Sequence, residues 1–311
     1  MSTSRRMRLL ADEQWARLAP CLPRNAGKTG RPFADHRRIT EGIIYRYRTG
    51  IPWRDLPRQE FGPWQTVWKR HRRWAADGTW DTVLAQFTAQ ADSIDGIDRA
   101  VSVDSTINRA QQHATNTTRP EKDTGAATCR SKSEAPATGG EPAGHAIGRS
   151  RGGLTTKIHH AVDGDGRPLA VVITPGQVHD AQVLSLLLGD IRVPRLGRGR
   201  PRTAPDARLA DKADSSQQIR AELAARGIRT VIPERADQQA NRRKKGSSGG
   251  RPRALDTQPY KRRNVVERSF SLLKQWRGLA TRYDKLAIVY RSAAVLAGCG
   301  NRPATKVRDT A

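Results

Sequence analysis

The segment "LTTKIHHAVDGDGRPLAVVITPG" at residues 154–176 consists of two apolar runs joined by a short polar turn. Both runs are rich in Val, Ile and Thr, whose branched side chains favour extended backbone. The intervening "DGDG" at residues 163–166 has the composition of a hairpin turn, because Asp and Gly tolerate the positive φ angles that tight turns need. The segment therefore predicts two adjacent antiparallel strands.

The elements around this hairpin predict the rest of a sheet. The β-type run "RAVSVDST" at residues 99–106 precedes it, which makes three strands in succession. Four elements follow: a helix capped by Asp180, the strand "DARLADKA" (206–213), a helix from Ser215 or Ser216 to Gly227, and the strand "IRTVIPE" (228–234). The order βββαβαβ, with one more helix after it, predicts an α/β fold with a mixed sheet and flanking helices, as in an RNase H-like fold.

The N-terminal third differs in composition, because six of the seven Trp residues lie in the first 80 positions. Such large side chains predict an aromatic core belonging to this part alone. Four helices are predicted: one capped by Asp12, one from Asp35 to Gly50, one following Pro63, and one capped by Thr79. We expect an all-α domain over residues 1–95.

The helix predicted after Pro63 is amphipathic. Its apolar stripe carries Trp side chains and His71, which we expect to be packed in the core rather than to bind a metal. Its opposite face is cationic and carries Lys69, Arg70, Arg72 and Arg73. Short helices with a basic later member are the outline of a helix-turn-helix domain, in which that helix enters the DNA major groove. A helical bundle with solvated Arg side chains is the alternative.

The whole chain is cationic, with a formal net charge of +26 and a pI near 11.2. Arg outnumbers Lys 44 to 12, which favours bidentate contacts to phosphate or guanine. The basic residues are spread over several segments, so we expect nucleic acid rather than a membrane as the partner. A solvated basic surface without a partner is the alternative.

Other sequence features predict a cytoplasmic protein. No apolar run is long enough to span a membrane, and the N-terminal segment lacks the apolar core of a signal peptide. Cys21, Cys129 and Cys299 are odd in number and far apart, which argues against a disulfide framework and a CxxC zinc site. A reducing compartment follows.

Two segments interrupt the predicted fold. Residues 113–150 are poor in large apolar side chains and rich in Thr, Ser, Ala, Gly and Pro, so we expect a flexible insertion. Residues 235–258 are a basic segment broken by Gly and Ser, which we expect to be a loop that becomes ordered on a polyanion.

In so basic a chain, carboxylates near strand ends are informative. Asp104 is predicted to close the first strand and Asp211 the fourth, so both would project from the same end of the sheet. Magnesium prefers hard oxygen ligands and is commonly held by a few carboxylates together with substrate phosphates. Two Asp residues on strands and one Glu on a helix would suffice.

The Glu in question is Glu267, in the cationic segment "PYKRRNVVERSFSLLKQW" at residues 259–276. If this segment is one helix, its polar stripe carries Tyr260, Arg263, Glu267, Ser271 and Lys274. The stripe would be about 21 Å long, which suits contact with a phosphate backbone. The spacing leaves two roles open for Glu267: a catalytic acid, or the salt-bridge partner of Arg263 four residues before it.

The spacing of Tyr260, Arg263, Glu267 and Lys274 resembles the Y-x2-R-x3-E-x6-K signature of the DDE transposases of bacterial insertion sequences, in the insertion sequence four and five superfamily. "SVDST" around Asp104 is similar to that family's first-Asp motif, and "LADKA" around Asp211 is similar to its second. The segments at residues 35–57 and 152–182 are also similar to the family. The resemblance covers residues 8 to 295.

The resemblance implies a transposase that binds the terminal inverted repeats of its own insertion sequence and catalyses metal-dependent DNA cleavage and strand transfer. It implies that residues 96–296 form an RNase H-like catalytic domain, with an irregular tail at 297–311. Asp104, Asp211 and Glu267 would be catalytic and would bind two Mg²⁺ ions, with Mn²⁺ as a substitute.

Further roles follow from the same resemblance. Tyr260, Arg263 and Lys274 would contact transposon-end DNA, in addition to the predicted basic helix near the N-terminus. The partners would be the inverted-repeat DNA, the target DNA and a second copy of the chain in a homodimer on DNA. The protein would act in the bacterial cytoplasm, associated with the nucleoid.

Three features depart from the family's pattern: the additional acid Asp214, the insertion 113–150 between the first two acids, and "CGNRPATKVRDTA" (299–311) in place of an apolar helix. The last would remove part of the final helix's apolar face. The alternative function is therefore a catalytically degenerate DNA-binding protein derived from such a transposase. A nuclease of RNA hybrids is a third possibility, and His159, His160 and His179 are expected to be structural rather than zinc ligands.

Overall fold

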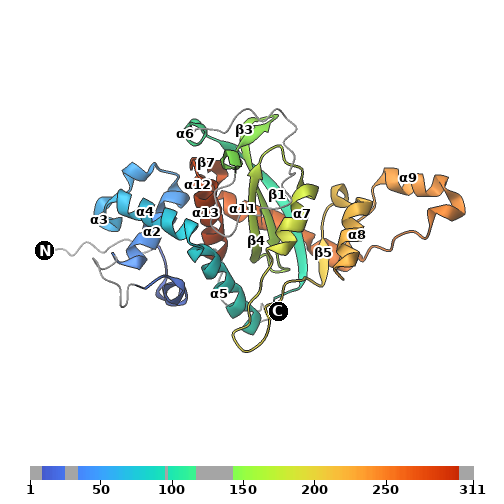
Figure 1. Cartoon of the computed structure of the whole chain (residues 1–311), viewed down its shortest axis with the longest axis horizontal. Helices are drawn as coiled ribbons and strands as arrows, with labels where there is room; N and C mark the ends of the chain where they lie inside the picture. Colours follow the sequence, from blue (N-terminus) through green and yellow to red (C-terminus); the bar gives the residue numbers. More distant parts are fainter. Residues whose placement is uncertain (1–8, 25–33, 95–96, 117–142, 301–311) are drawn as a thin grey trace, which may run out of the picture.

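The computed structural model describes residues 9–24, 34–94, 97–116 and 143–300. The middle of the predicted insertion, Cys129 and the last part of the predicted tail lie outside these ranges. Helices dominate the first part of the chain (Figure 1): α1 (Asp12–Leu18), α2 (His36–Thr49), α3 (Arg58–Phe61), α4 (Trp64–Ala76) and α5 (Thr79–Ile94). Within the described residues, no helix is long and apolar enough to cross a membrane.

The start and end of α2 agree with the prediction. The Asp35 carboxylate accepts hydrogen bonds from the backbone N–H groups of Arg37 and Arg38, and Gly50 ends the helix with a φ of 74°. Three other predicted caps are wrong. Asp12 is the first residue of α1, and Thr79 is the first residue of α5, where it donates to the carboxylate of Asp77. Asp180 is likewise the first residue of its helix, which His179 caps.

The second part of the chain forms a seven-stranded mixed sheet. Its strands are β1 (Ala100–Ala110), β2 (Gly148–Ser150), β3 (Gly153–Val162), β4 (Pro168–Pro175), β5 (Ala207–Leu209), β6 (Arg229–Val231) and β7 (Thr281–Arg282). β1 lies between β3, which is antiparallel to it, and β5, which is parallel to it; β4 pairs with β3, and β6 pairs with β5. The predicted hairpin and the predicted mixed sheet are thus confirmed.

Helices cover both faces of this sheet (Figure 1). They are α7 (Asp180–Gly189) and α8 (Gln217–Ala225) on one face, and α11 (Val265–Lys274) and α13 (Ala287–Gly300) on the other. The smaller helices are α6 (Gln112–Thr115), α9 (Ala236–Lys244), α10 (Thr257–Lys261) and α12 (Arg277–Ala280). Alternate β3 residues sort to the two sides: Ala161 packs with α7 and α8, whereas Ile158 and Val162 pack with α11 and α13.

The N-terminal helices do not have a core of their own, which corrects the prediction. One apolar cluster joins Trp74 and Trp80 of this region to Tyr290 and Leu296 of α13. A buried ion pair between Arg46 and Asp284, at 3.0 Å, also links α2 to the segment before α13. The aromatic residues near the N-terminus therefore stabilise the helical layer of the sheet domain, and the boundary proposed near residue 95 divides a shared core.

The final helix keeps its apolar face. α13 continues to Gly300, and Ala297 and Cys299 are buried within it, so residues 297–300 are not an irregular tail. The predicted loss of core contacts on this face is wrong for the described residues, because the helix lies between the N-terminal helices and the sheet and is covered on both sides.

Both predicted interruptions contain regular structure. Residues 148–150 of the predicted insertion form β2, and the carbonyls of His145 and Ala146 accept hydrogen bonds from the buried Arg282 guanidinium. The basic segment 235–258 is not a loop. It contains α9, a 3-10 turn at Gly246–Gly249 and the start of α10, and it projects from the end of the molecule opposite α2–α4 (Figure 1).

Candidate active site

Asp104 lies within β1 rather than at its end, because the strand continues to Ala110. It is paired in register with His160 of β3. His160 stacks on Phe270 of α11, with ring centroids 5.0 Å apart. Since residues opposite each other in a sheet point to the same side, Asp104 lies on the sheet face that α11 covers.

Asp211 follows the end of β5, as predicted. The parallel register pairs Ser102 of β1 with Leu209 of β5. Asp104 lies two residues after Ser102, and Asp211 lies two residues after Leu209, just past the end of β5. Neighbouring strands are about 4.8 Å apart, and both residues contribute to the lining of one cavity. The Asp211 carboxylate also accepts a hydrogen bond of 2.6 Å from the N–H of Lys212, which caps a 3-10 turn at Lys212–Asp214.

Four carboxylates line one cavity of about 100 Å³ at this position: Asp104, Asp180, Asp211 and Asp214. Burial raises the pKa of Asp104, the N–H of Ser105 opposes that shift, and the neighbouring Asp180 carboxylate raises the pKa further. Within the described ranges, neither Asp104 nor Asp211 forms an ion pair. Asp180 and Asp214 are paired with Lys157 and Arg208, so Asp104 and Asp211 are the two acids at this cavity whose oxygens could bind a divalent cation.

Asp214 has a structural partner that the sequence did not reveal. Its carboxylate accepts a hydrogen bond of 2.5 Å from Nη2 of Arg208, whose side chain is buried in the same cavity. Nε and Nη1 of Arg208 have no hydrogen-bond partner among the described residues. The additional acid thus holds the turn after Asp211 against β5. An Arg in an apolar strand, six residues before an Asp, was the available signal.

Asp180 is a second acid that sequence reasoning did not assign to the site. His179 caps α7, and Asp180 is its first residue. The Asp180 carboxylate accepts from Ser105 Oγ at 2.8 Å and from Lys157 Nζ at 3.1 Å, and lies 3.5 Å from His159 Nδ1. It is therefore already neutralised by a mostly buried Lys, unlike the neighbouring Asp104.

The three histidines of this region make packing or capping contacts. His159 shares a hydrogen bond of 2.8 Å with Thr174, His160 is stacked on Phe270, and Nδ1 of His179 accepts from the N–H of Ala181. Burial lowers the pKa values of His159 and His160 to about 4. His71 is likewise buried among aromatic rings of the N-terminal helices.

Glu267 lies in the first turn of α11, with its side chain 51% exposed. The helix packs on β1 and β3 through a face that includes Val266 and Phe270. The Glu267 carboxylate forms an ion pair of 2.9 Å with Arg263, and the charge of Arg263 also lowers the pKa of Asp104. Of the two roles left open for Glu267, the structure contains the salt bridge. The part of the chain that the structure describes contains no group of three His, Cys, Asp or Glu residues arranged to hold a metal.

The predicted continuous helix from Tyr260 to Lys274 is interrupted by a 3-10 turn at Arg262–Asn264. Tyr260 is consequently half-buried against Leu209 and Leu255 instead of lying on an exposed stripe. The Arg263 guanidinium lies over the Tyr260 ring, 5.9 Å from its centroid. Lys274, in the last turn of α11, is exposed.

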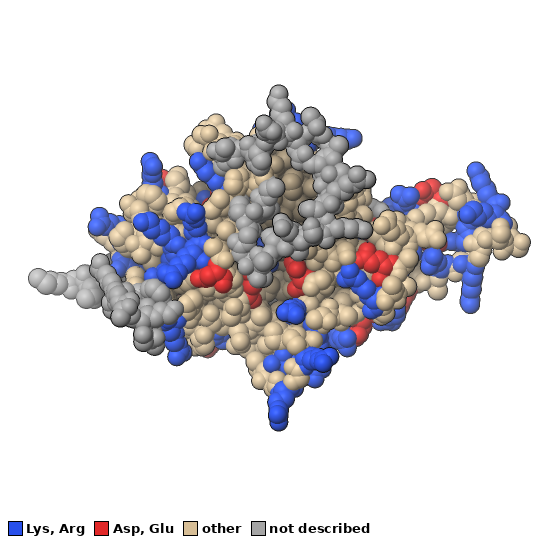
Figure 2. Space-filling model, in the orientation of Figure 1, with Lys and Arg blue, Asp and Glu red and all other residues tan. Residues whose placement is uncertain are grey.

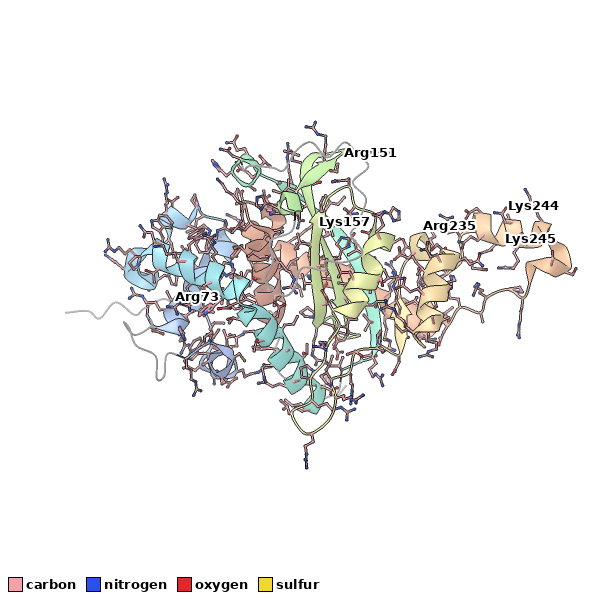
Figure 3. All side chains as sticks on the ribbon, viewed as in Figure 1. Arg73, Arg151, Lys157, Arg235, Lys244 and Lys245 are labelled. Carbon is pink, nitrogen blue, oxygen red and sulfur yellow. The ribbon has the colours of Figure 1, made fainter. Side chains whose placement is uncertain are left out.

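The predicted basic face of α4 is largely exposed. Lys69, Arg72 and Arg73 are exposed, whereas Arg70 is half-buried and contacts Nδ1 of His36 at 3.1 Å. Figure 3 shows Arg73 at the end of the molecule opposite Lys244 and Lys245. Figure 2 shows further Lys and Arg side chains at the end of the molecule formed by the N-terminal helices.

Both parts of the chain match families of transposases. Residues 10–84 match the family described as "Putative transposase of IS4/5 family", and residues 95–301 match the family described as "Transposase DDE domain".

Curated relatives include a protein called "Putative transposase for insertion sequence element IS402" from Burkholderia cepacia, 32% identical over 53% of this chain and 67% of the relative. "Insertion element IS402 uncharacterized 16.2 kDa protein" from the same species is 35% identical over 33% of this chain and 74% of the relative. "Uncharacterized protein y4sN" of Sinorhizobium fredii is 36% identical over 34% of this chain and 79% of the relative.

Among solved structures, a pre-cleavage Mos1 transpososome aligns with 12% identity and a TM-score of 0.23, over 88% of this chain and 79% of that chain. A TM-score this low establishes no common fold. The sequence match is different in kind, because the transposase DDE domain spans more than half of the chain and includes Asp104, Asp211 and Glu267. On this evidence the chain belongs to the DDE transposases of insertion sequences.

Proposed function

We propose that the protein binds the terminal inverted repeats of its own insertion sequence, cuts the DNA there and joins the freed ends to a target. The observation that carries the proposal is that Asp104 of β1 and Asp211, which directly follows the neighbouring strand β5, line the same cavity. The sheet order, with three antiparallel strands extended by two parallel ones, supports an RNase H-like catalytic domain.

Asp104 and Asp211 would hold divalent metal, Mg²⁺ or Mn²⁺, with Glu267 as the third ligand. When bound, two such ions stabilise the attacking and leaving oxygens of an in-line displacement at phosphorus. Asp104 and Asp211 need no large movement for this role, because neighbouring strands hold them. Glu267 is held only by an exposed ion pair, so its carboxylate has to leave Arg263 to reach the metal.

The basic side chains around these acids would bind the DNA. Arg263 and Lys274 would contact phosphates, and Tyr260 would support Arg263 from beneath while contacting a sugar or base at its exposed edge. When Glu267 turns to the metal, the Arg263 guanidinium becomes available to a phosphate. When DNA and metal are both bound, the single Glu267–Arg263 ion pair would thus be replaced by two interactions, Glu267 with the metal and Arg263 with a phosphate.

The N-terminal helices would bind the repeat sequence. Lys69, Arg72 and Arg73 on the exposed face of α4 are suited to a helix-turn-helix contact in the major groove. We further propose that the protein acts as a homodimer on DNA, because two ends have to be joined, and that it does so in the bacterial cytoplasm, on nucleoid DNA.

The test is metal-dependent nicking of a duplex that carries the DNA flanking the coding region. Asp104→Asn, Asp211→Asn and Glu267→Gln are each expected to lower the nicking rate by at least about 100-fold. Each variant should bind the duplex as the unmodified protein does. Asp206→Asn is the matched control, since this exposed acid pairs with Arg99 away from the cavity. Nicking by the Glu267 variant at the rate of this control would refute the site.

A catalytically degenerate DNA-binding protein is the second candidate. The Glu267–Arg263 ion pair favours it, because a permanent pair would keep the third acid away from the cavity. In that case the protein would bind the flanking duplex tightly, and neither Mg²⁺ nor Mn²⁺ would produce nicks.

A further inference from the structure

Residues 235–256, here called the basic arm, form a projection from the sheet domain. The arm leaves after β6, contains α9 and the turn Gly246–Gly249, and returns to α10 (Figure 1). None of the residues in α9 or in the turn is buried. α9 alone is about 14 Å long at 1.5 Å per residue. The arm therefore adds exposed surface rather than core.

The arm is attached to the body by a few contacts at its base. The Ser215 hydroxyl donates to the side-chain carbonyl of Gln238 at 2.8 Å, while the Gln238 amide donates to the Ser215 carbonyl at 3.0 Å. Leu255 packs against Leu209 and Val231 of the sheet. These contacts connect both ends of the arm to β5 and β6 or to the turn after Asp211.

A single acid joins the two limbs of the arm. The Glu234 carboxylate forms an ion pair with Arg242 of α9 and lies 3.7 Å from Nε of Arg253 on the returning limb. The Glu234 carbonyl also accepts from the side chain of Gln239 at 3.2 Å. Three of the arm's polar residues are thus used to hold its shape.

The far end of the arm is shaped by glycine. A Cβ on Gly249 would lie 2.2 Å from the carbonyl oxygen of Arg242, so only glycine allows the turn to pack against α9. Gly250 has a φ of 75°, which reverses the chain toward the body. The turn is therefore a defined structure that presents α9 and the returning limb together.

Several charges at this far end form no ion pair among the residues that the structure describes. The arm contains seven Lys or Arg residues and two Asp residues. Of these, Arg243, Lys244, Lys245 and Arg251 are exposed and form no ion pair with any described residue. Figure 3 shows Lys244 and Lys245 at the end of the projection, and Figure 2 shows Lys and Arg side chains around that end.

We propose that the basic arm is a second DNA-binding element, which grips the phosphate backbone of a duplex without reading its sequence. This inference rests on the proposed function, because it extends the DNA from the cleavage site along the molecule. The chain passes directly from the arm into the segment that carries Tyr260, Arg263 and Glu267, so DNA at that segment can continue to Arg251 and α9.

The chemistry of the arm favours duplex DNA over other polyanions. It carries no aromatic side chain on which an unpaired base could stack. It also has no apolar side chain at its far end to enter a membrane, since Leu255 packs against the sheet. A backbone of regularly spaced phosphates matches a group of neighbouring cations that form ion pairs with no described residue.

The experiment compares two triple variants of the full chain. Arg243→Gln, Lys244→Gln and Lys245→Gln remove three charges from the arm. Arg195→Gln, Arg198→Gln and Arg200→Gln remove three exposed charges from the loop between α7 and β5 and form the control. Binding to a short duplex of random sequence, to its single strand, and to a duplex from the DNA flanking the coding region is measured by fluorescence anisotropy across a salt series.

The arm variant is expected to reduce the slope of log K against log salt by about 2.7 for random duplex, since each phosphate contact contributes about 0.9. Between about 50 mM and about 200 mM salt, the unmodified protein should lose about 40-fold more affinity than this variant. Flanking duplex should show the same change in slope. The control variant should keep the original slope, and so should the arm variant with single-stranded DNA.

Equal losses in the two triple variants would overturn the proposal, because they would indicate general charge attraction. An unchanged slope in the arm variant, or a loss confined to the single strand, would overturn it too. Random duplex tests the arm independently of cleavage, so a protein that fails to nick DNA can still show the arm's effect. Conversely, nicking that depends on Glu267 with no effect of the arm would reject this inference alone.

Discussion

Asp104 and Asp211 are held by the sheet, whereas Glu267 is held by a surface ion pair. Asp104 lies in β1, Asp211 directly follows the neighbouring parallel strand β5, and the turn after Asp211 is held by the buried Arg208–Asp214 pair. Glu267 projects from a helix preceded by a 3-10 turn, with half of its side chain exposed. Asp104 and Asp211 are therefore held in place by the fold, whereas Glu267 can change its partner when its own side chain and that of Arg263 rotate.

This difference indicates where the cost of assembling the site falls. Asp104 and Asp211 already lie at one cavity, and the pKa of Asp104 is raised mainly by burial and further by the carboxylates of Asp180 and Asp214. In the proposed site, Glu267 would join these two carboxylates by giving up its ion pair with Arg263. Because an exposed ion pair of this kind contributes about 0.3 to 0.5 kcal/mol, that exchange is cheap.

Disrupting the Arg208–Asp214 pair, which holds the turn after Asp211, should have the largest effect on stability. Arg208→Met leaves Asp214 without its partner next to the carboxylates of the cavity, and we expect a loss of about 3 kcal/mol in the free energy of unfolding. Urea denaturation measures it. Arg235→Met, which removes the exposed pair with Asp237, is the control and should cost less than about 0.5 kcal/mol.

Adding Asp214→Leu to the Arg208 variant should recover much of that loss, since the stranded charge disappears. A double variant as unstable as the single one would contradict the assigned role of the pair. It would mean that packing of the Arg208 side chain, rather than its charge, holds the turn after Asp211.

The sheet side of the site was also the part that sequence could predict. Alternating and β-branched runs depend on local geometry, so the hairpin at residues 154–176 and the mixed sheet followed from pattern, whereas the short strands β2 and β7 were not predicted. Asp211 was predicted at a strand end and lies there. Asp104 was misplaced, because β1 continues past it as far as Ala110, where it pairs with β7 and β3.

The parts that sequence could not predict depend on contacts between distant residues. Arg208 and Asp214 looked unrelated until β5 and its turn were folded. The N-terminal aromatic residues looked like a separate core because their partner, α13, lies some 200 residues away in sequence. The break between α10 and α11 follows the burial of Tyr260 against β5, which helical periodicity does not contain.

His160 connects Asp104 to the helix that carries Glu267. It lies opposite Asp104 in the sheet and stacks on Phe270 of α11. Its folded pKa is lowered from 6.5 to about 4 by burial, so the unfolded chain binds the proton more readily. The stability that neutral His160 provides is therefore complete above pH 6.5. It is lost as the pH falls from 6.5 toward 4.

His160→Phe should sharpen this assignment. At pH 7 a swap of similar volume should change the unfolding free energy by less than about 1.5 kcal/mol. Between pH 7 and pH 5, the unfolding free energy of the variant relative to that of the unmodified protein should rise by about 2 kcal/mol. Urea denaturation at the two pH values gives both numbers. Parallel pH dependences in the two proteins would show that His160 is not the group that titrates.

Disrupting the Glu267–Arg263 ion pair should have the smallest effect on stability and a specific effect on activity. Arg263→Gln releases Glu267 and should change the unfolding free energy by no more than about 0.5 kcal/mol. The same change removes a cation that lowers the pKa of Asp104, so that pKa rises further. The acid limb of single-turnover nicking at saturating DNA should therefore move to higher pH. Arg268→Gln, on an exposed position of the same helix, should leave the limb in place. An equal shift of the acid limb in both variants would mean that Arg263 acts only through the general positive potential of the basic surface. The proposed exchange of Glu267 between Arg263 and the metal would then lose its support.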